Sequence, residues 1–216
     1  MASVKNVCVY GLASSIYRSG YPMMDKAPDD VQFGESVKDI EWAIVTATDN
    51  PHVKRAINLA NAKGGGHDQF LAGIIVNFDL CISNKAWVEA ERYTFLNFIS
   101  SMSTMHRISK LPISECCNEY TLEEGIRKAE QLQWAYNSID GAEHPETKKE
   151  AYLKLLYNLP SGFELTAAMT TNYRCLKNIY AQRRNHRLPD WKVVCDWIET
   201  LPMAAELITG KDGKDG

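Results

Sequence analysis

The pattern of apolar and polar positions along the chain predicts a protein built mainly of helices. The longest helical pattern covers residues 163–186, which contain no Pro or Gly and are rich in good helix formers. Asn172 and Arg183 are eleven residues apart, close to three helical turns, so they are predicted to share one face. Leu176 and Ile179 lie between them on that face. An apolar stripe with a polar group at each end suits a helix that packs into a core and also faces a pocket.

The rest of the chain is predicted to contain two strands, one long loop and several further helices. Strands are predicted at 4–10 and 71–80, and the Gly-, Pro-, Ser- and Asp-rich segment 11–34 is predicted to be a loop. Helices are predicted at 36–47, 51–63, 83–99, 122–139, 145–157 and 191–207. We expect more than half of the residues to be helical, above the usual share.

The predicted fold class is therefore α+β, a helix-rich single domain with a small central sheet. The domain is expected to cover residues 1–208, and the strand 71–80 is expected to pack against the helix 83–99. The Gly-rich polar segment 209–216 is expected to be a flexible tail.

Composition and charge exclude several classes of protein. The 216 residues are 45% hydrophobic and carry a net charge of -3, which permits one sizeable core and makes nucleic-acid binding an unfavoured function. No apolar run reaches the ~20 residues that span a bilayer, and the first residues do not form a signal peptide, so we expect a cytoplasmic protein without membrane contact. The six cysteines are interpreted as reduced thiols, and their spacing predicts no metal site. No Ser-His-Asp set is defined by spacing.

Two groups of polar residues are candidates for anion binding. Arg183, Arg184, His186 and Arg187 form a cationic cluster, which either complements a helix dipole or binds an anion in a pocket. The hydroxyl-rich segment 100–107 ends in a His and an Arg, and it is either a nucleotide or anion site or a solvated helix end.

One motif in this part of the chain resembles that of a known family. Leu-Pro, then Asn-x-Arg-x-Leu, then an Arg nine residues after the first Arg resembles the C-terminal signature of flavin-dependent thymidylate synthases, the ThyX-like family. The matching residues are Leu159, Pro160, Asn172, Arg174, Leu176 and Arg183. The resemblance implies that Asn172 and Arg174 contact FAD and that Arg183 holds the phosphate of dUMP. His67, three residues before a Phe at the entry to a predicted strand, also occurs in that family and joins the cofactor-binding candidates, with a purely structural His as the alternative.

The motif that names the family is degenerate in this chain. Of its opening Arg-His-Arg only Arg92 is present, and Tyr93 stands where the His is expected, so both are carried over as cofactor-binding candidates. Glu89 replaces the Gln that precedes this motif, and an insertion of one helical turn would allow Arg107 to take the role of the motif's late Arg. The substrate-binding candidates are Glu89, Ser101, Ser103, Arg107 and Arg183.

The resemblance implies an enzyme that methylates dUMP, with FAD as cofactor and with NADPH and methylenetetrahydrofolate as co-substrates. It also implies a homotetramer whose sites are built between subunits. A variant of this hypothesis is the modification of a related pyrimidine nucleotide. The alternative is a catalytically degenerate protein that binds a nucleotide or flavin without turnover, and a structural protein without a ligand is the third hypothesis.

Overall fold

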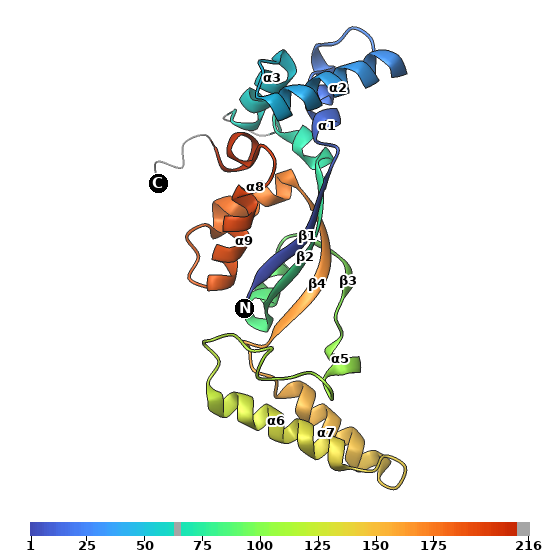
Figure 1. Ribbon diagram of the computed structural model, residues 1–216, viewed down its shortest axis with the longest axis vertical. Coiled ribbons are helices and arrows are strands. Elements are labelled where there is room, and N and C mark those ends of the chain that lie inside the picture. Colours follow the sequence, from blue (N-terminus) through green and yellow to red (C-terminus); the bar gives the residue numbers. More distant parts are fainter. Residues whose placement is uncertain (63–65, 211–216) are drawn as a thin grey trace.

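The computed structural model describes residues 1–62 and 66–210, and it shows an elongated molecule with a central sheet (Figure 1). The strands are β1 (Ser3–Tyr10), β2 (Ile75–Ser83), β3 (Asn97–Ser101) and β4 (Glu164–Asn172). The helices are α1 (Leu12–Arg18), α2 (Asp30–Thr46), α3 (Pro51–Ala60), α4 (Asn84–Ala90), α5 (Thr104–Arg107), α6 (Glu123–Ser138), α7 (Pro145–Tyr157), α8 (Tyr173–Arg183) and α9 (Pro189–Glu199), with short helical turns η1 (Tyr21–Met23), η2 (Gln69–Gly73) and η3 (Ala205–Thr209). More than half of the chain is helical, so the predicted α+β class with a small sheet is confirmed.

The sheet is antiparallel, with strand order β1-β2-β4-β3. Strands β2 and β4 pair along their whole length, from Ile75 opposite Asn172 to Ser83 opposite Glu164. Every second residue of β2, beginning with Val76, is buried beneath the helices of one face, where Phe78 contacts Trp197 of α9 at 4.5 Å between ring centroids. Helices α8 and α9 lie beside the sheet, α1–α3 lie at one end, and the α6–α7 hairpin lies at the other (Figure 1).

The predicted helix 163–186 is wrong in its first half, which forms strand β4. Residues of β4 alternate in burial, with Ala167, Met169 and Thr171 buried. Three Thr residues favour a strand, and pairing with β2 and β3 outweighs the helix propensity of the Leu, Ala and Met between them. The second half is helix α8, in which Leu176, Ile179 and Arg183 do share a buried face.

Two other predicted helices are shorter than expected. The predicted helix 83–99 ends at Ala90, and its last residues, from Asn97 on, belong to strand β3, which pairs with β4. The predicted helix 191–207 ends at Glu199, because Pro202 has no N–H to continue the helical hydrogen bonds. The expected packing of β2 against α4 is present, although α4 is only two turns long.

The N-terminal predictions need smaller corrections. The segment predicted as a loop, 11–34, contains α1, whose Ile16 is fully buried, and the start of α2. The predicted strand 71–80 begins only at Ile75, after the turn η2. Helix α3 ends at Ala60. Lys63, the predicted end of this helix, lies outside the described residues. Residues 211–216 of the predicted tail also lie outside them.

The α6–α7 hairpin has a small core of its own, separate from the main core around the sheet. Its two helices agree with the predicted segments 122–139 and 145–157 to within one residue. The buried residues of this second core are Ile108, Ile113, Ala129, Leu155 and Phe163. The chain thus consists of a sheet-centred body and a helical hairpin that projects from it (Figure 1).

We expect Asn172→Ala to lower the free energy of unfolding by about 1 kcal/mol. Asn172 Oδ1 accepts a hydrogen bond from the Cys175 N–H at 2.9 Å, and it thereby caps the first turn of α8. Asn178→Ala, on an exposed position of the same helix, is the matched control, since it removes an amide that caps nothing. Equilibrium unfolding in urea measures both variants, and equal losses for the two would refute the capping role.

Candidate functional site

Four of the predicted cofactor-binding residues line one cavity at the start of α8. The cavity has a volume of about 480 Å³. Arg92 and Tyr93 reach it from the turn after α4, and Asn172 and Arg174 reach it from the junction of β4 and α8. Its other lining residues are Gln69, Ala72, Thr94, Phe95, Cys175, Asn178 and Gln182. We refer to this cavity as the α8 pocket.

The wall that α8 contributes to this pocket is a polar stripe. Arg174, Asn178 and Gln182 follow one another at intervals of four residues, so they lie on one face of the helix. Leu176 and Ile179 point into the core instead. The sequence analysis did not identify Asn178 and Gln182, although their spacing from Arg174 was a signal that could have located them.

Arg174 is held at the edge of the α8 pocket by residues that precede β2. Its Nε donates to Asp68 at 3.2 Å, and its Nη1 donates to the side-chain oxygen of Gln69 at 2.7 Å. Lys177 also donates to Asp68, at 3.0 Å. Burial works against the charge of Asp68, but the bonds to Lys177 and Arg174 outweigh it and hold the pKa of Asp68 below its usual value.

The predicted cofactor residue His67 is exposed and does not line the α8 pocket. It directly precedes Asp68, the carboxylate that binds Arg174. The structure therefore places His67 next to the support of the pocket, and its contact with a ligand remains a prediction.

The groups that line the α8 pocket fit a ligand with a flat ring and an anionic part. Arg92 and Arg174 offer guanidinium groups that match phosphate oxygens. The Oδ1 atom of Asn172 caps α8, which leaves its amide NH₂ as a donor. The rings of Tyr93 and Phe95 provide flat surfaces. The volume of the α8 pocket lies within the range of about 300–1,000 Å³ that is typical of small-molecule sites.

Arg183 lies directly behind this pocket, in a buried cluster of charged and aromatic side chains. Its Nη1 donates to Glu89 at 3.0 Å, and its Nε donates to the hydroxyl of Tyr93 at 2.7 Å. The guanidinium carbon lies 4.7 Å from the ring centroid of Trp191. Only 7% of Arg183 is exposed, so its charge has to be compensated inside the protein.

Glu89 compensates this charge and is the centre of the cluster. Besides Arg183, its carboxylate accepts a hydrogen bond from Trp191 Nε1 at 3.1 Å and lies 3.3 Å from His186 Nε2 and 3.5 Å from Lys85 Nζ. Burial opposes the charge of Glu89, but the bond from Trp191 and the charges of His186 and Arg183 lower its pKa overall. The anion beside Arg183 in this structure is thus the chain's own carboxylate, and contact of Glu89 and Arg183 with a substrate remains a prediction.

The other predicted substrate-binding residues lie elsewhere in the chain. Ser101 is the exposed last residue of β3, and Ser103 caps the short helix α5 by accepting a hydrogen bond from the His106 N–H at 3.3 Å. Ser103 and Arg107 line a second cavity of about 340 Å³, between β4 and the segment before α6. Within one chain, therefore, the structure does not bring these residues together with Arg183.

The described residues, 1–62 and 66–210, contain no group of three or more side chains placed to bind a metal ion. None of the helices in this part of the chain combines the length and apolar composition needed to cross a bilayer.

Comparison with solved structures finds proteins that share this fold over nearly the whole chain. Thymidylate synthase X (ThyX) from Helicobacter pylori, crystallised with FAD and dUMP, superposes with a TM-score of 0.59 at 14% identity, covering 96% of both chains. A second Helicobacter pylori ThyX structure, also with FAD and dUMP, gives a TM-score of 0.60 at 15% identity, covering 96% of this chain and 97% of the other. The fold is ThyX-like.

A third structure with the ThyX-like fold is that of PolB from Streptomyces cacaoi, a UMP/dUMP methylase bound with 5-Br dUMP. It gives a TM-score of 0.56 at 12% identity and covers 97% of this chain and 95% of its own. No protein-family model matches the sequence, and the search of curated proteins finds no match. The fold implied by the motif at 159–183 is therefore confirmed by the three-dimensional comparison.

We expect Glu89→Gln to destabilise the protein by about 2–3 kcal/mol near neutral pH, because it leaves the buried Arg183 without its counter-charge. The pKa of Glu89 is lowered in the folded protein, so its stabilising effect is present above the pKa of the unfolded chain and is lost as the pH falls through the folded value. The difference in stability between the parent and Glu89→Gln should therefore shrink as the pH falls below about 4.5.

Urea unfolding at a series of pH values measures this difference. Glu91→Gln, which changes an exposed carboxylate one residue beyond α4, is the control and should differ little from the parent at any pH. A gap between the parent and Glu89→Gln that stays constant down to pH ~3 would contradict the ion-pair interpretation.

Proposed function

We propose that the chain is a ThyX-like enzyme that methylates dUMP, or modifies a related pyrimidine nucleotide, with FAD bound in the α8 pocket. The observation that carries the proposal is that Arg92 and Tyr93 meet Asn172 and Arg174 in one cavity, although about eighty residues separate the two pairs. Both pairs were assigned to FAD by their position in the family's motifs. The solved structures with this fold include complexes with FAD and dUMP, which supports the same ligands here.

The proposed roles follow from the chemistry of each side chain. Arg92 and Arg174 bind the anionic part of the cofactor, the Asn172 amide donates to its polar edge, and Tyr93 packs against its ring. When bound, the flavin supplies hydride to the uracil ring, with methylenetetrahydrofolate as carbon donor and NADPH as reductant of the flavin. The protein's own contribution is to bind, orient and exclude water, which requires no nucleophilic side chain in the pocket.

We further propose that dUMP is bound between subunits of a homotetramer. The predicted substrate residues form two groups in the chain, Glu89 with Arg183 and Ser101 with Ser103 and Arg107, and a subunit interface would bring one group of each kind together. Strand β3, which carries Ser101, is exposed along its whole length at the edge of the sheet, and such an edge is available for another subunit.

A second candidate function is binding of a nucleotide or flavin without turnover. The observation that favours it is the pairing of Arg183 with Glu89, because a phosphate would have to compete with a carboxylate that already neutralises the guanidinium. The Arg-His-Arg motif is lost apart from Arg92, which also favours binding without turnover.

The absorbance spectrum of the purified protein, before and after addition of FAD, tests the flavin proposal, and we expect a flavin band that remains after gel filtration. Product analysis after incubation with dUMP, methylenetetrahydrofolate and NADPH then separates the two candidates. We expect dTMP, whereas bound flavin without any product would support the binding protein. Light scattering on the same sample gives the assembly, and a mass near 24.4 kDa, that of one chain, would contradict the shared site.

Substitution of the two arginines should separate cofactor binding from substrate binding. We expect Arg174→Ala to weaken FAD binding about tenfold with little effect on dUMP, through loss of a charge-assisted hydrogen bond. We expect Arg183→Ala to weaken dUMP binding by about ten- to a hundredfold and FAD less, because a phosphate would lose its buried cation and face Glu89 instead.

Calorimetric titration of both ligands against both variants gives the four affinities. Arg127→Ala, which removes an exposed cation on α6, controls for a general loss of positive charge. Because Arg183 is buried, the folded state of Arg183→Ala is checked by circular dichroism, and Arg183→Lys, which keeps the charge, should bind dUMP with intermediate affinity. Unchanged dUMP binding by a folded Arg183→Ala would show that Glu89 is the only anion that Arg183 binds.

A further inference from the structure

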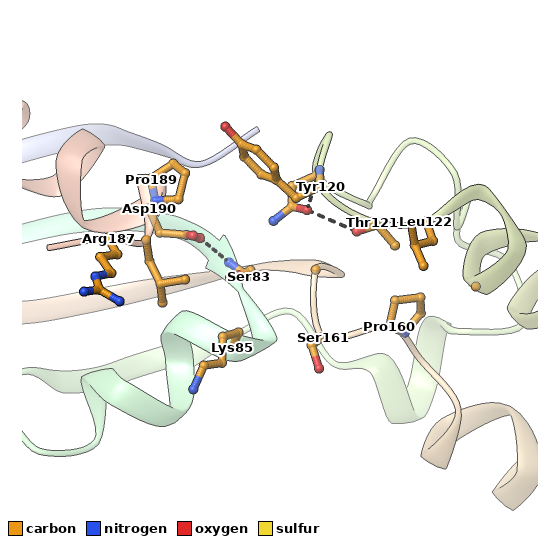
Figure 2. A pocket seen from close by; sticks show the side chains of 14 residues that line it. Ser83, Lys85, Tyr120, Thr121, Leu122, Pro160, Ser161, Arg187, Pro189 and Asp190 are labelled. Carbon is orange, nitrogen blue, oxygen red and sulfur yellow. Dashed lines mark hydrogen bonds between the residues drawn. The ribbon is translucent and has the colours of Figure 1, made fainter.

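A groove of about 600 Å³ includes Pro160 of the Leu-Pro motif in its lining (Figure 2). It lies between the sheet-centred body and the α6–α7 hairpin. Four short segments line it: the start of α4 at 83–85, the residues 118–125 around the start of α6, the loop 160–162 before β4, and the residues 187–190 at the start of α9. Among the described residues, it shares no lining residue with the α8 pocket.

The walls of this groove are fixed by hydrogen bonds between its segments. The Lys85 N–H donates to the Ser161 carbonyl at 3.0 Å, and the Asn118 N–H donates to the Gly162 carbonyl at 3.0 Å. The buried carboxylate of Asp190 accepts a hydrogen bond from the Ser83 N–H at 2.8 Å, which ties α9 to the end of β2. A groove whose walls are already ordered requires little conformational entropy to bind a ligand.

Gly162 shows how closely the two loops of the groove approach each other. A Cβ atom at this position would lie 2.1 Å from Thr121 Oγ1 and 2.6 Å from Asn118 Oδ1, so a larger residue would require these side chains to shift. The side chain of Asn118 is itself held, since its Oδ1 accepts from the Tyr120 N–H and the Thr121 hydroxyl. The groove is therefore a rigid feature of the surface, although it is built from irregular loops.

One end of the groove is apolar. Leu122 is 77% exposed and Pro160 lies beside it, whereas Tyr120, which is 68% exposed, lies beside Pro189 (Figure 2). Exposed apolar side chains that are held in place favour association with an apolar body that removes them from water. The ring of Tyr120 beside Pro189 offers a further flat surface, which suits an aromatic ring.

The other end of the groove is cationic. Figure 2 shows Arg187 and Lys85 on the side of the groove away from Leu122 and Pro160, with their side chains apart from each other. Among the described residues Arg187 forms no ion pair, and Lys85 has only a loose one, 3.5 Å from Glu89. The one carboxylate in the lining, Asp190, is buried and bound to the backbone, so it does not compete for these cations as an exposed acid would.

We propose that this groove is a second ligand site, for a small molecule with an aromatic ring and one anionic group, a carboxylate or phosphate. The ring lies against Leu122 and Pro160, and the anion lies on the side of the groove that holds Arg187 and Lys85. This site is independent of the function proposed for the α8 pocket. A ligand bound in this groove contacts both the α6–α7 hairpin and the sheet-centred body, and it therefore links the two.

The test uses the full chain with naphthalene-2-carboxylate as the probe and naphthalene-2-carboxamide as its uncharged counterpart, both titrated by calorimetry. We expect the carboxylate to bind and Arg187→Gln to weaken it by about five- to tenfold, with little effect on the carboxamide. Leu122→Ser should weaken both probes by about threefold, because it shortens the apolar wall. Both changes are at exposed positions and should leave the fold intact.

Arg127→Gln, an exposed cation on α6 that is not part of the lining, is the matched control and should bind both probes like the parent. Excess FAD should leave binding of the probe unchanged, because the α8 pocket is separate. The proposal is overturned if the parent binds neither probe, if it binds both equally, if Arg187→Gln and Arg127→Gln behave alike, or if FAD displaces the probe.

Discussion

The pairing of β2 with β4 is the constraint on which the rest of the structure depends. It runs without a register shift from the end of η2 to the start of α4, and it places Asn172 at one end of the sheet and Glu164 at the other. Because β4 leads directly into α8, the same pairing determines where α8 begins and which of its faces looks into the core. The α8 pocket lies at the end of this strand pair that holds Asn172, and the groove lies at the end that holds Ser83. A shift of one residue in the register would turn every side chain of β4 to the opposite face.

Carboxylates from outside α8 determine how the two arginines of its motif are presented. Asp68 binds Arg174 at a half-exposed position, where the remaining donors of the guanidinium stay open to the pocket. Glu89 binds Arg183 in the interior, where Tyr93 and Trp191 close over it. The two arginines therefore carry the same charge, but the charge of Arg174 is open to the pocket, whereas that of Arg183 is buried and paired with Glu89. Tyr93 connects the two environments, since it lines the pocket and its hydroxyl accepts the hydrogen bond from Arg183.

The sequence predicted the fold class and the hairpin helices, because these depend on patterns that are local or that match a known motif. Four residues that the motifs assigned to FAD line one cavity, and their contact with FAD stays a prediction. The sequence failed for β4 and β3, whose strand conformation depends on partners far away in the chain. The segment E-L-T-A-A-M-T-T-N has a composition that either conformation tolerates, so its pairing with β2 decides. The cluster around Glu89 could not be predicted either. The partners of Glu89 come from α4, from α8, from the segment between α8 and α9, and from α9, and nothing in their spacing shows that one carboxylate binds them all.

The separate core of the α6–α7 hairpin has a consequence for the motions of the molecule. A unit with few buried apolar side chains of its own is expected to open at a lower free energy than the sheet does. Amide hydrogens in α6 and α7 should therefore exchange with solvent faster than those of β2 and β4. A molecule bound in the groove between the hairpin and the body would slow the exchange of the amides in α6 and α7.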